Sequence, residues 1–378
     1  MKILYVLPHP IQYQTPFINY LYKNGLDILV GYQSNISSKV FYDKGFNKKI
    51  KWGKYILKGH NFFFNKDFSK KNFFSFFSQK ILTTILLDRK IKIVWVHGSK
   101  KISNILIIIF SKLLKKKVFL REENNLESKN RDNFNIFFNK IFYFILNFFV
   151  DYYLSIGKKN YKYYILNNIN KKKIKHVPYA VDNNYFSQQK LIKKDYKKIN
   201  FLFVGKLNAS KGIGLLMDVM NDISIDKKYS KKISFKIVGN GLLYSKIKKY
   251  VKDKKLDFIK ILNFQSQKQL KSIYKKSDIL ILPSITEPWG LVINEALNAG
   301  NAIICSDKVG ASGDLVIHKK NGFVFKTENK EQLSKCIISY LENNSLINAH
   351  KKIGRQIVNN FSFDICLKNI NKILHEIK

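Results

Sequence analysis

Short apolar runs alternate along the chain with longer segments in which apolar residues return every three or four positions. The first run is "KILYVL", which a proline-containing turn separates from "FINYLYKNG", a segment with helical spacing that ends at a glycine. The strand-like runs of the first half lie at 2–7, 26–32, 91–99 and 116–124, and helical patterns lie at 17–25 and 102–116. This alternation predicts a parallel sheet with helices on both faces.

The second half repeats the same alternation. Its strand-like runs lie at 199–207, 233–241, 257–264, 277–284 and 301–307, and helical patterns follow at 212–223, 267–277 and 331–343. The pattern therefore predicts an α/β protein with two doubly wound, Rossmann-like domains, at 1–186 and 187–360. The polar, lysine-rich stretch 187–198 is the expected linker. We expect the closing amphipathic helix, 361–378, to cross back to the first domain.

Length and hydropathy agree with two domains and predict no membrane span. A chain of 378 residues exceeds the usual size of one core, and 46% hydrophobic residues can fill two. The most apolar run, 141–150, is ten residues long, whereas a spanning helix needs roughly 20. The uninterrupted apolar run before Pro8 is only five residues long, at 3–7, which is too short for a secretory signal. We therefore expect a cytoplasmic protein.

The three cysteines, Cys305, Cys336 and Cys366, are odd in number and widely spaced. No Cys-x-x-Cys or His-x-x-x-His pattern accompanies them. This spacing predicts buried thiols in a reducing compartment and no metal site.

The formal net charge of +42 raises the possibility of a nucleic-acid partner. Only four of the 68 basic residues are arginines, although base reading and phosphate clamping both favour the arginine fork. Lys, Asn, Ile, Phe and Tyr are abundant throughout, which is typical of a compositional bias. We expect no nucleic acid partner, and a basic nucleic-acid-binding protein remains the alternative from another functional class.

Candidate chemistry begins where the predicted strands end, because ligands of open parallel sheets bind beyond the carboxyl ends of the strands. In "ILPSITEPWGLVINEALNAG", at 281–300, Glu287 lies in the turn after a strand. Glu295 lies five residues into the next helix, about 7.5 Å along it. The free N–H groups around Trp289 to Val292 favour an anion such as phosphate. Gly290 allows the ligand to approach the backbone closely.

Two further strand ends carry glycines and cations. In "GKLNASKGIG", at 205–214, Lys206 and Lys211 flank small residues, so that both ammonium groups can converge on one anion. A leaving pyrophosphate needs such cations as its negative charge develops. The segment "VGNG", at 238–241, supplies another turn after a strand.

Taken in order, these motifs resemble the donor-binding domain of the group 1 (family 4) retaining glycosyltransferases, which have the GT-B fold. The segments that carry the resemblance are "VPYAVDNNYF", "GKLNASKG", "VGNG", "PSITEPWGLVINEA" and "VGASGDLVIHKKNGFVF". They cover roughly residues 150 to 340. Each motif is weak alone, but the ordered set is specific. The resemblance implies two domains that face a common cleft.

The resemblance also implies roles for single residues. Glu287 would bind hydroxyls of the donor sugar near the reacting carbon, and Glu295 would bind the ribose. Lys206 and Lys211 would bind the diphosphate. The implied donor-binding set is Gly205, Gly239, Asn263, Pro288, Trp289, Gly290, Leu291 and Glu295. The departures from the family pattern are Lys206 for Arg, Trp289 for Phe, Asn263 for Gly and Asp314 for Glu.

The first domain carries the implied acceptor site. His97 ends a strand and resembles a family histidine that reaches the reacting sugar, although a strand-end histidine without catalytic duty is the alternative. His9, Gln12 and Gln14 follow the first strand and are candidate acceptor contacts. Arg121 and Glu122 also end a strand, where they either line the acceptor cleft or form a structural pair.

The sequence thus predicts sugar transfer from a nucleotide diphosphate to an acceptor hydroxyl with retention, without a metal or other cofactor. The expected acceptor is a glycan or lipid-linked glycan of bacterial surface polysaccharide or lipopolysaccharide assembly. A nucleotide-sugar epimerase and a membrane scaffold with an inactive site remain alternatives. Segment 62–80 interleaves eight Phe with four Lys. It is either an interface with an anionic membrane or part of the core.

Overall fold

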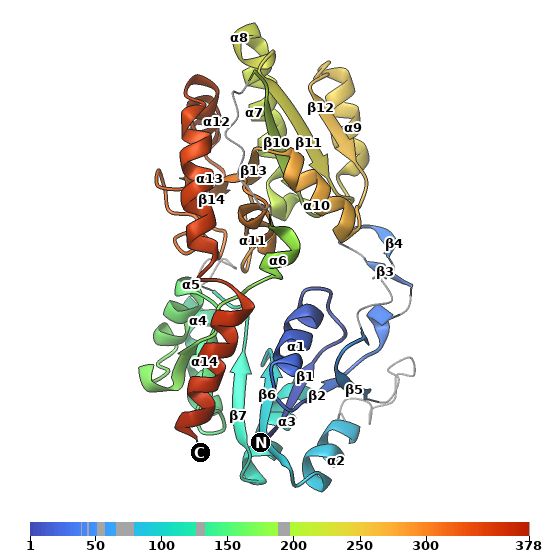
Figure 1. Cartoon of the computed structure of the whole chain (residues 1–378), viewed down its shortest axis with the longest axis vertical. Helices are drawn as coiled ribbons and strands as arrows, with labels where there is room; N and C mark the ends of the chain where they lie inside the picture. Colours follow the sequence, from blue (N-terminus) through green and yellow to red (C-terminus); the bar gives the residue numbers. More distant parts are fainter. Residues whose placement is uncertain are drawn as a thin grey trace.

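The computed structural model describes residues 1–38, 40–43, 45–50, 57–65, 79–125, 133–187 and 197–377. They form two parallel α/β units that follow one another along the long axis of the molecule (Figure 1). The predicted fold class is therefore confirmed. Most of the expected linker (188–196) and most of the Phe-rich segment (66–78) lie outside the described residues.

The first unit contains a seven-stranded sheet in the order β5-β2-β1-β6-β7-β8-β9. All neighbouring strands in it run parallel. The strands are β1 (Lys2–Leu7), β2 (Ile28–Tyr32), β5 (Asn61–Phe64), β6 (Ile91–His97), β7 (Lys117–Arg121), β8 (Tyr152–Ser155) and β9 (Ile174–His176). The sequence pattern missed β5, β8 and β9, because these strands of three or four residues lie outside the longer strand-like runs in which a period can be seen.

Helices cover both faces of this sheet. One face packs on α1 (Gln14–Lys23) and α14 (Phe363–Glu376). The other packs on α2 (Gln79–Leu87), α3 (Ile102–Leu113), α4 (Asn133–Leu146) and α5 (Lys158–Leu166). A small antiparallel hairpin of β3 (Phe41–Asp43) and β4 (Lys48–Ile50) stands apart from the sheet. Short 3₁₀ turns lie at η1 (Ile36–Ser38) and η4 (Lys171–Lys173).

The second unit contains a six-stranded parallel sheet in the order β12-β11-β10-β13-β14-β15. Its strands are β10 (Ile199–Val204), β11 (Ile233–Val238), β12 (Ile259–Leu262), β13 (Ile279–Leu282), β14 (Ala302–Ser306) and β15 (Gly322–Phe325). Most residues of β10, β13 and β14 are buried, since helices cover both faces and every side chain meets a core. The five predicted strands are present but shorter, and β10 and β11 end directly before the motif glycines Gly205 and Gly239.

Two helical layers enclose this second sheet. One core includes α7 (Ile213–Ile225), α9 (Tyr244–Asp253) and α12 (Lys330–Glu342). The other includes α6 (Asn183–Phe186), α10 (Gln267–Lys276), α11 (Leu291–Asn298) and α13 (Ser345–Val358). The short elements η5 (Ala209–Lys211) and α8 (Lys227–Ser230) precede and follow α7. Cys305, Cys336 and Cys366 are free and buried, as predicted.

The C-terminal helix α14 returns to the first unit and lies beside α1 (Figure 1). Its residues Phe363, Cys366, Ile370 and Ile373 are buried in the core of the first sheet. Lys175 at β9 also pairs with Glu376, at 2.5 Å between Nζ and Oε2. The helix therefore fastens the end of the chain to the unit in which the chain began.

Direct contacts hold the two units together near the carboxyl ends of both sheets. Lys159 on α5 donates hydrogen bonds to Val309 O at 3.1 Å and to Ser312 Oγ at 2.8 Å. Asp314 accepts a hydrogen bond from the N–H of Lys158 at 2.8 Å, at the start of α5, where a negative charge is favourable. Asp314 thus joins the two units. The sequence analysis noted only that Asp314 replaces the Glu of the family pattern and did not predict this contact.

No helix within the described ranges is long and apolar enough to cross a membrane. The apolar run at 141–150 belongs largely to α4, on the surface of the first unit.

Candidate active site

Two adjoining cavities, of about 340 Å³ and 330 Å³, lie where strand ends of both units meet. Tyr13, Phe46, Val204, Gly205, Leu291 and Val292 line both cavities. The first, which we name the transfer cavity after the reaction that the sequence predicts, is further lined by Glu123, Tyr179, Lys206, Lys211, Leu282, Glu287, Trp289 and Gly290. The second, which we name the nucleoside cavity after the part of the donor expected at Glu295, is also lined by His9, Gln12, Asp43, Gly239, Phe264 and Glu295, among others.

Motif glycines let the strand ends approach closely enough to form these walls. A Cβ on Gly239 would lie 1.9 Å from Gly205 O, and a Cβ on Gly212 would lie 2.0 Å from Pro283 O. Both glycines also have positive φ, +151° and +65°, which other residues rarely adopt. The spacing of "GKLNASKG" and "VGNG" is therefore a packing requirement that places Lys206 and Lys211 at the transfer cavity.

Lys211 and Glu287 form an ion pair in the transfer cavity, between Nζ and Oε2. Their side chains are 19% and 13% exposed, so the pair is largely withdrawn from water. The backbone of Glu287 is held in turn, because its carbonyl accepts a hydrogen bond from Gly310 N at 2.9 Å. The sequence placed both residues at one crevice but did not foresee that each would be the other's partner.

The start of α11 opens onto the same cavity. Gly290, at φ +94°, is the N-cap, and Leu291 begins the helix. Trp289 is 3% exposed and donates from Nε1 to Asn294 Oδ1 at 2.9 Å, so its ring is a fixed part of the cavity wall. Pro288 is not among the described lining residues of either cavity, and its carbonyl accepts a hydrogen bond from Asn125 Nδ2 at 2.7 Å.

Lys206 is engaged by the opposite unit. Its Nζ lies 3.1 Å and 3.3 Å from the two carboxylate oxygens of Asp43, at the end of β3. The same ammonium lies 4.8 Å from the ring centroid of Phe46, and the Phe46 ring packs edge-on against Phe264 at 5.2 Å. Burial by itself would raise the pKa of the Asp43 carboxyl. Hydrogen bonds from Phe46 N and Lys206 outweigh this effect, so the pKa lies below its usual value. The sequence carried no signal that this hairpin reaches the second unit.

Glu295 lines the nucleoside cavity. Its carboxylate accepts a hydrogen bond from Tyr274 OH at 2.8 Å. Burial raises its pKa to about 7, against the opposing effect of this hydrogen bond. Asn263 is different, because its side chain is exposed, bonds to Asn240 at 3.3 Å and is not among the described lining residues. Its φ is not positive, so the turn after β12 does not need a glycine.

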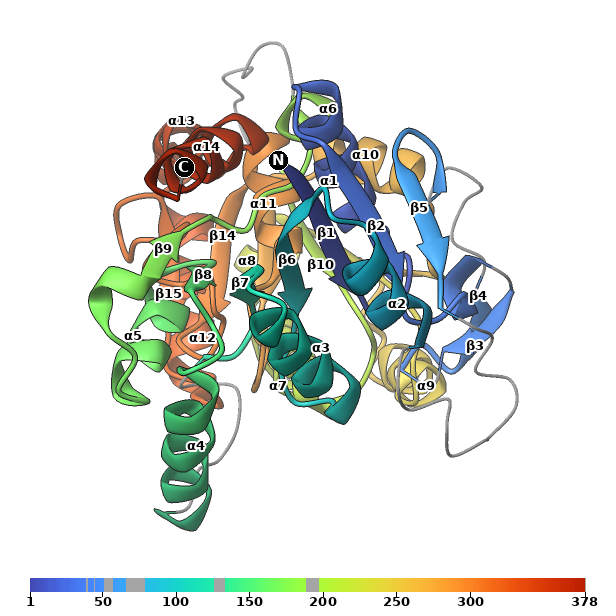
Figure 2. The ribbon, with the colours of Figure 1, turned by 90° about the horizontal axis from the view of Figure 1, so that it is seen from below.

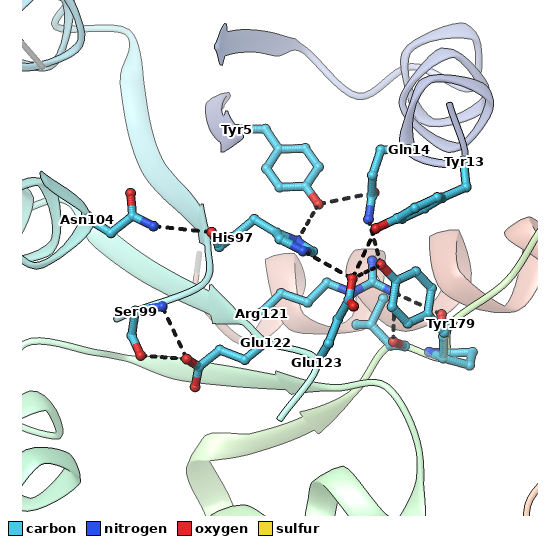
Figure 3. Close-up of polar contacts among 12 residues, drawn as sticks. Tyr5, Tyr13, Gln14, His97, Ser99, Asn104, Arg121, Glu122, Glu123 and Tyr179 are labelled. Atoms are coloured by element: carbon cyan, nitrogen blue, oxygen red, sulfur yellow. Dashed lines mark hydrogen bonds and ion pairs between the residues drawn. The ribbon is translucent and has the colours of Figure 1, made fainter. Parts of the chain in front are cut away.

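The opposite wall of the transfer cavity is built around Glu123 (Figure 3). Its Oε1 accepts hydrogen bonds from Tyr179 OH at 2.5 Å and Tyr13 OH at 3.1 Å, and lies 3.6 Å from His97 Nε2. No described residue binds its Oε2. Burial by itself would raise the pKa of the Glu123 carboxyl. His97 and the hydroxyls of Tyr179 and Tyr13 outweigh this effect, so the pKa lies below its usual value. An ionised carboxylate with one unengaged oxygen therefore faces the Lys211–Glu287 pair.

Sequence reasoning stopped one residue before Glu123. Arg121 is 1% exposed and donates to Val177 O at 3.3 Å and Pro178 O at 3.0 Å. Glu122 points the other way and accepts from Ser99 N at 3.1 Å and Tyr143 OH at 2.6 Å (Figure 3). Neither lines either cavity, nor do they pair with each other. The alternation of a strand, continued beyond β7, would have separated Glu122 from its two neighbours.

The remaining candidates of the first unit divide into two groups. His9 and Gln12 line the nucleoside cavity, and burial lowers the pKa of His9. Gln14 is 1% exposed, and its amide is engaged within the first unit. Its Oε1 accepts a hydrogen bond from Tyr5 OH at 3.3 Å, and its Nε2 donates to Tyr179 OH at 3.2 Å. His97 lies behind Glu123, with Nδ1 3.5 Å from Tyr5 OH. His97 therefore contacts the Glu123 carboxylate from behind and helps to hold it in place. Within the described ranges, no three His, Cys, Asp or Glu side chains are close enough to hold a metal ion.

Residues 184–357 match the family "Glycosyl transferases group 1". An uncharacterized glycosyltransferase of Methanocaldococcus jannaschii is 29% identical over 176 residues, 47% of this chain and 48% of that protein. A second from the same archaeon is 28% identical over 289 residues, 73% of each. The chain thus spans about half the length of the first relative. The family match falls on the second unit and leaves the first unit outside it.

Some of the relatives are named for an activity. The N-acetylgalactosamine-N,N'-diacetylbacillosaminyl-diphospho-undecaprenol 4-alpha-N-acetylgalactosaminyltransferase of Campylobacter jejuni is 26% identical over 229 residues, 58% of this chain and 59% of that enzyme.

Solved structures share the whole architecture. The Anabaena protein HepE in complex with UDP superposes with a TM-score of 0.75 and 15% identity, over 100% of both chains. The lipopolysaccharide outer core galactosyltransferase WaaB gives 0.74 and 14%, also over 100% of both chains. At these identities the likeness establishes the fold, which is GT-B.

Proposed function

We propose that this protein transfers a sugar from a nucleotide diphosphate to an acceptor hydroxyl with retention at the anomeric carbon. The observation that carries the proposal is the transfer cavity, in which Lys206, Lys211, Glu287 and the start of α11 converge. Cations and free helix N–H groups suit a diphosphate, and a carboxylate suits sugar hydroxyls. The match of residues 184–357 to the group 1 family supports the same activity.

The donor would span both cavities. Its diphosphate lies at Lys206 and Lys211, and its nucleoside enters the cavity that Phe264, Gly239 and Glu295 line. Glu295 accepts hydrogen bonds from the ribose. HepE, which has the same fold, has been solved in complex with UDP and with UDP-glucose, which supports a nucleoside diphosphate sugar and makes UDP the first nucleotide to test.

The protein promotes the transfer step chiefly by electrostatic stabilisation of the leaving group. The bond between the anomeric carbon and the phosphate oxygen breaks while the acceptor oxygen bonds to the same face of that carbon. The acceptor proton passes to the leaving phosphate. Lys206 and Lys211 stabilise the developing negative charge, so we expect no metal or other cofactor. Asp43 holds Lys206 in the free protein, and the diphosphate displaces this carboxylate when it binds.

The acceptor approaches from the wall of the first unit, where Glu123 offers its Oε2 to a hydroxyl. We propose a glycan or lipid-linked glycan acceptor, in the cytoplasm, in the assembly of a surface polysaccharide or lipopolysaccharide. The Campylobacter jejuni relative is named for a diphospho-undecaprenol acceptor, and WaaB for the lipopolysaccharide outer core. An epimerase of the same fold is the alternative.

A thermal-shift screen tests the donor assignment. UDP-, GDP-, ADP- and TDP-sugars are added to the wild type, to Lys211→Met and to the control Lys252→Met on the exposed side of α9. A ligand at 100 times its dissociation constant adds about 2.7 kcal/mol of stability. We expect one nucleotide class to stabilise the wild type and Lys252→Met, but not Lys211→Met.

Turnover separates the remaining alternatives. Release of nucleotide without any acceptor indicates the epimerase. If no nucleotide sugar raises the melting temperature while duplex or single-stranded DNA binds with steep salt dependence, the transferase proposal is wrong.

A further inference from the structure

Helix α4 is apolar on the side that faces solvent as well as on the side that packs on the sheet. Tyr143 and Leu146 are buried inward. At about 100° per residue, the outward apolar residues cover an arc of about 120°. They are Phe137, Phe138, Ile141, Phe144, Ile145 and Phe148, each between 40% and 66% exposed. Six of the eighteen exposed large hydrophobic residues among the described part of the chain therefore lie on one short segment, which we name the α4 face.

Such a concentration marks a binding surface, because single exposed apolar residues are common and contiguous patches are rare. The helix stands out from the rest of the first unit when the molecule is viewed from below (Figure 2). No part of the described chain covers the outward side of Phe144 or Phe148, which are 64% and 66% exposed.

The charge around the α4 face indicates the kind of partner that it binds. Residues 133–175 contain eight lysines and a single acid, Asp151. That acid is engaged by Lys112 and Lys117, with Nζ–Oδ1 distances of 2.8 Å and 3.5 Å. Lys140 lies at the edge of the apolar arc, and Lys171 and Lys172 are exposed just beyond the C-terminal end of the helix. The surroundings of the α4 face therefore carry a net positive charge.

We propose that the α4 face docks this protein onto an anionic lipid surface. Aromatic and aliphatic side chains enter the interface between headgroups and acyl chains, while the lysines remain with the anionic headgroups. A second copy of the chain fits less well, since a symmetric contact through this face would bring the lysines of both copies together. This inference is independent of the proposed transfer reaction.

The α4 face is coupled to the transfer cavity. Tyr143 donates a hydrogen bond to Glu122 Oε2 at 2.6 Å. Glu122 directly precedes Glu123 in the sequence, and Glu123 lines the transfer cavity. Lys173 donates to Asn147 O at 2.7 Å and Val150 O at 2.9 Å, which fixes the far end of the helix. A bilayer bound to this face therefore has a fixed position relative to the cavity.

The first experiment reports insertion directly. Phe144→Trp and the control Leu242→Trp, an exposed position in the second unit, are mixed with vesicles of equimolar phosphatidylcholine and phosphatidylglycerol. We expect the emission of Phe144→Trp alone to shift to the blue and to be quenched by brominated lipid. An unchanged Phe144→Trp spectrum in the presence of these vesicles would overturn the proposal.

The second experiment measures binding by vesicle flotation of the whole protein. The triple variant Phe137→Ser, Phe144→Ser, Phe148→Ser should lose at least about tenfold in partitioning, whereas Ile225→Ser, also exposed, should bind like the wild type. Binding should weaken in about 0.5 M salt and on pure phosphatidylcholine. Equal binding of the triple variant overturns the proposal, as does a wild-type dimer that the triple variant converts to monomers without any vesicle binding.

Discussion

The two walls of the transfer cavity are built on different principles. The wall of the second unit contains residues of the segments that connect strands to the next helices, such as Lys206, Lys211 and Glu287, within compact sequence motifs. The wall of the first unit consists of Tyr13, Phe46, Glu123 and Tyr179, which come from four distant segments. Glu287 pairs with a cation of its own unit, whereas Glu123 is held by hydroxyls and a histidine.

This difference separates two kinds of constraint. A wall that binds a diphosphate needs backbone N–H groups and close strand ends, so its glycines and lysines are fixed in spacing. A wall that binds only hydroxyl groups needs a carboxylate in the right orientation, and many arrangements of supporting side chains can supply it. We therefore expect the donor wall to be the more sensitive to substitution, with effects that differ in kind from those of the acceptor wall.

The largest expected effect is on the donor wall. Glu287→Ala, or Lys211→Ala, should reduce the rate of sugar transfer about 100-fold to 1000-fold, because each removes charge beside the reacting carbon. Transfer is measured with the nucleotide sugar that the thermal-shift screen identifies, and circular dichroism checks the fold. Glu331→Ala, an exposed acid on α12, is the control. Near-wild-type rates in both site variants would contradict the assignment of this wall.

A smaller and different effect is expected on the acceptor wall. Glu123→Ala should lower kcat/KM for the acceptor about 10-fold to 100-fold, since a charged hydrogen bond contributes about 1.5–3 kcal/mol. Nucleotide affinity, measured by calorimetry, should stay unchanged. Glu123→Gln keeps the shape and an acceptor oxygen, so it should lie between the wild type and the alanine variant. A loss of nucleotide affinity instead would place Glu123 at the donor.

The smallest effect concerns the nucleoside cavity. Burial raises the pKa of Glu295 to about 7, so this carboxyl is largely neutral at pH 6 and largely ionised at pH 8. Ionised oxygens accept stronger hydrogen bonds from ribose hydroxyls, so nucleotide affinity should rise several-fold over this range. Glu295→Gln should remove the dependence. Calorimetric titrations at both pH values test this, and a wild-type affinity that falls with pH would reverse the assignment.

The same shift predicts a change in stability without ligand. Because the folded pKa of Glu295 exceeds its usual value, its contribution to stability is present in acid and is lost as the pH rises through about 7. The free energy of unfolding of Glu295→Gln should therefore depend less on pH between about 5 and 8 than that of the wild type.

Strand periodicity predicted most strands of the two large sheets, but it missed β5, β8, β9 and β15, because three or four residues alone cannot display a period. The strands β12 and β13 are equally short, but they lie within longer strand-like runs, at 257–264 and 277–284. The donor motifs located Lys206, Lys211, Glu287 and Glu295 at the two cavities. Three further predicted residues, Asn263, Pro288 and Gln14, are not among the described lining residues of either cavity, and their side chains or carbonyls form hydrogen bonds elsewhere.

By itself, the sequence determined the two parallel sheets and the cavity wall of the second unit, because period, glycine spacing and strand ends are local properties of the chain. Only the tertiary structure decided which carboxylate of the first unit faces that wall. It brought Glu123, Tyr13, Tyr179 and His97 together from positions up to 166 residues apart and placed Asp43 against Lys206. Such contacts follow from how the sheets pack across the cavity, and no local pattern encodes them.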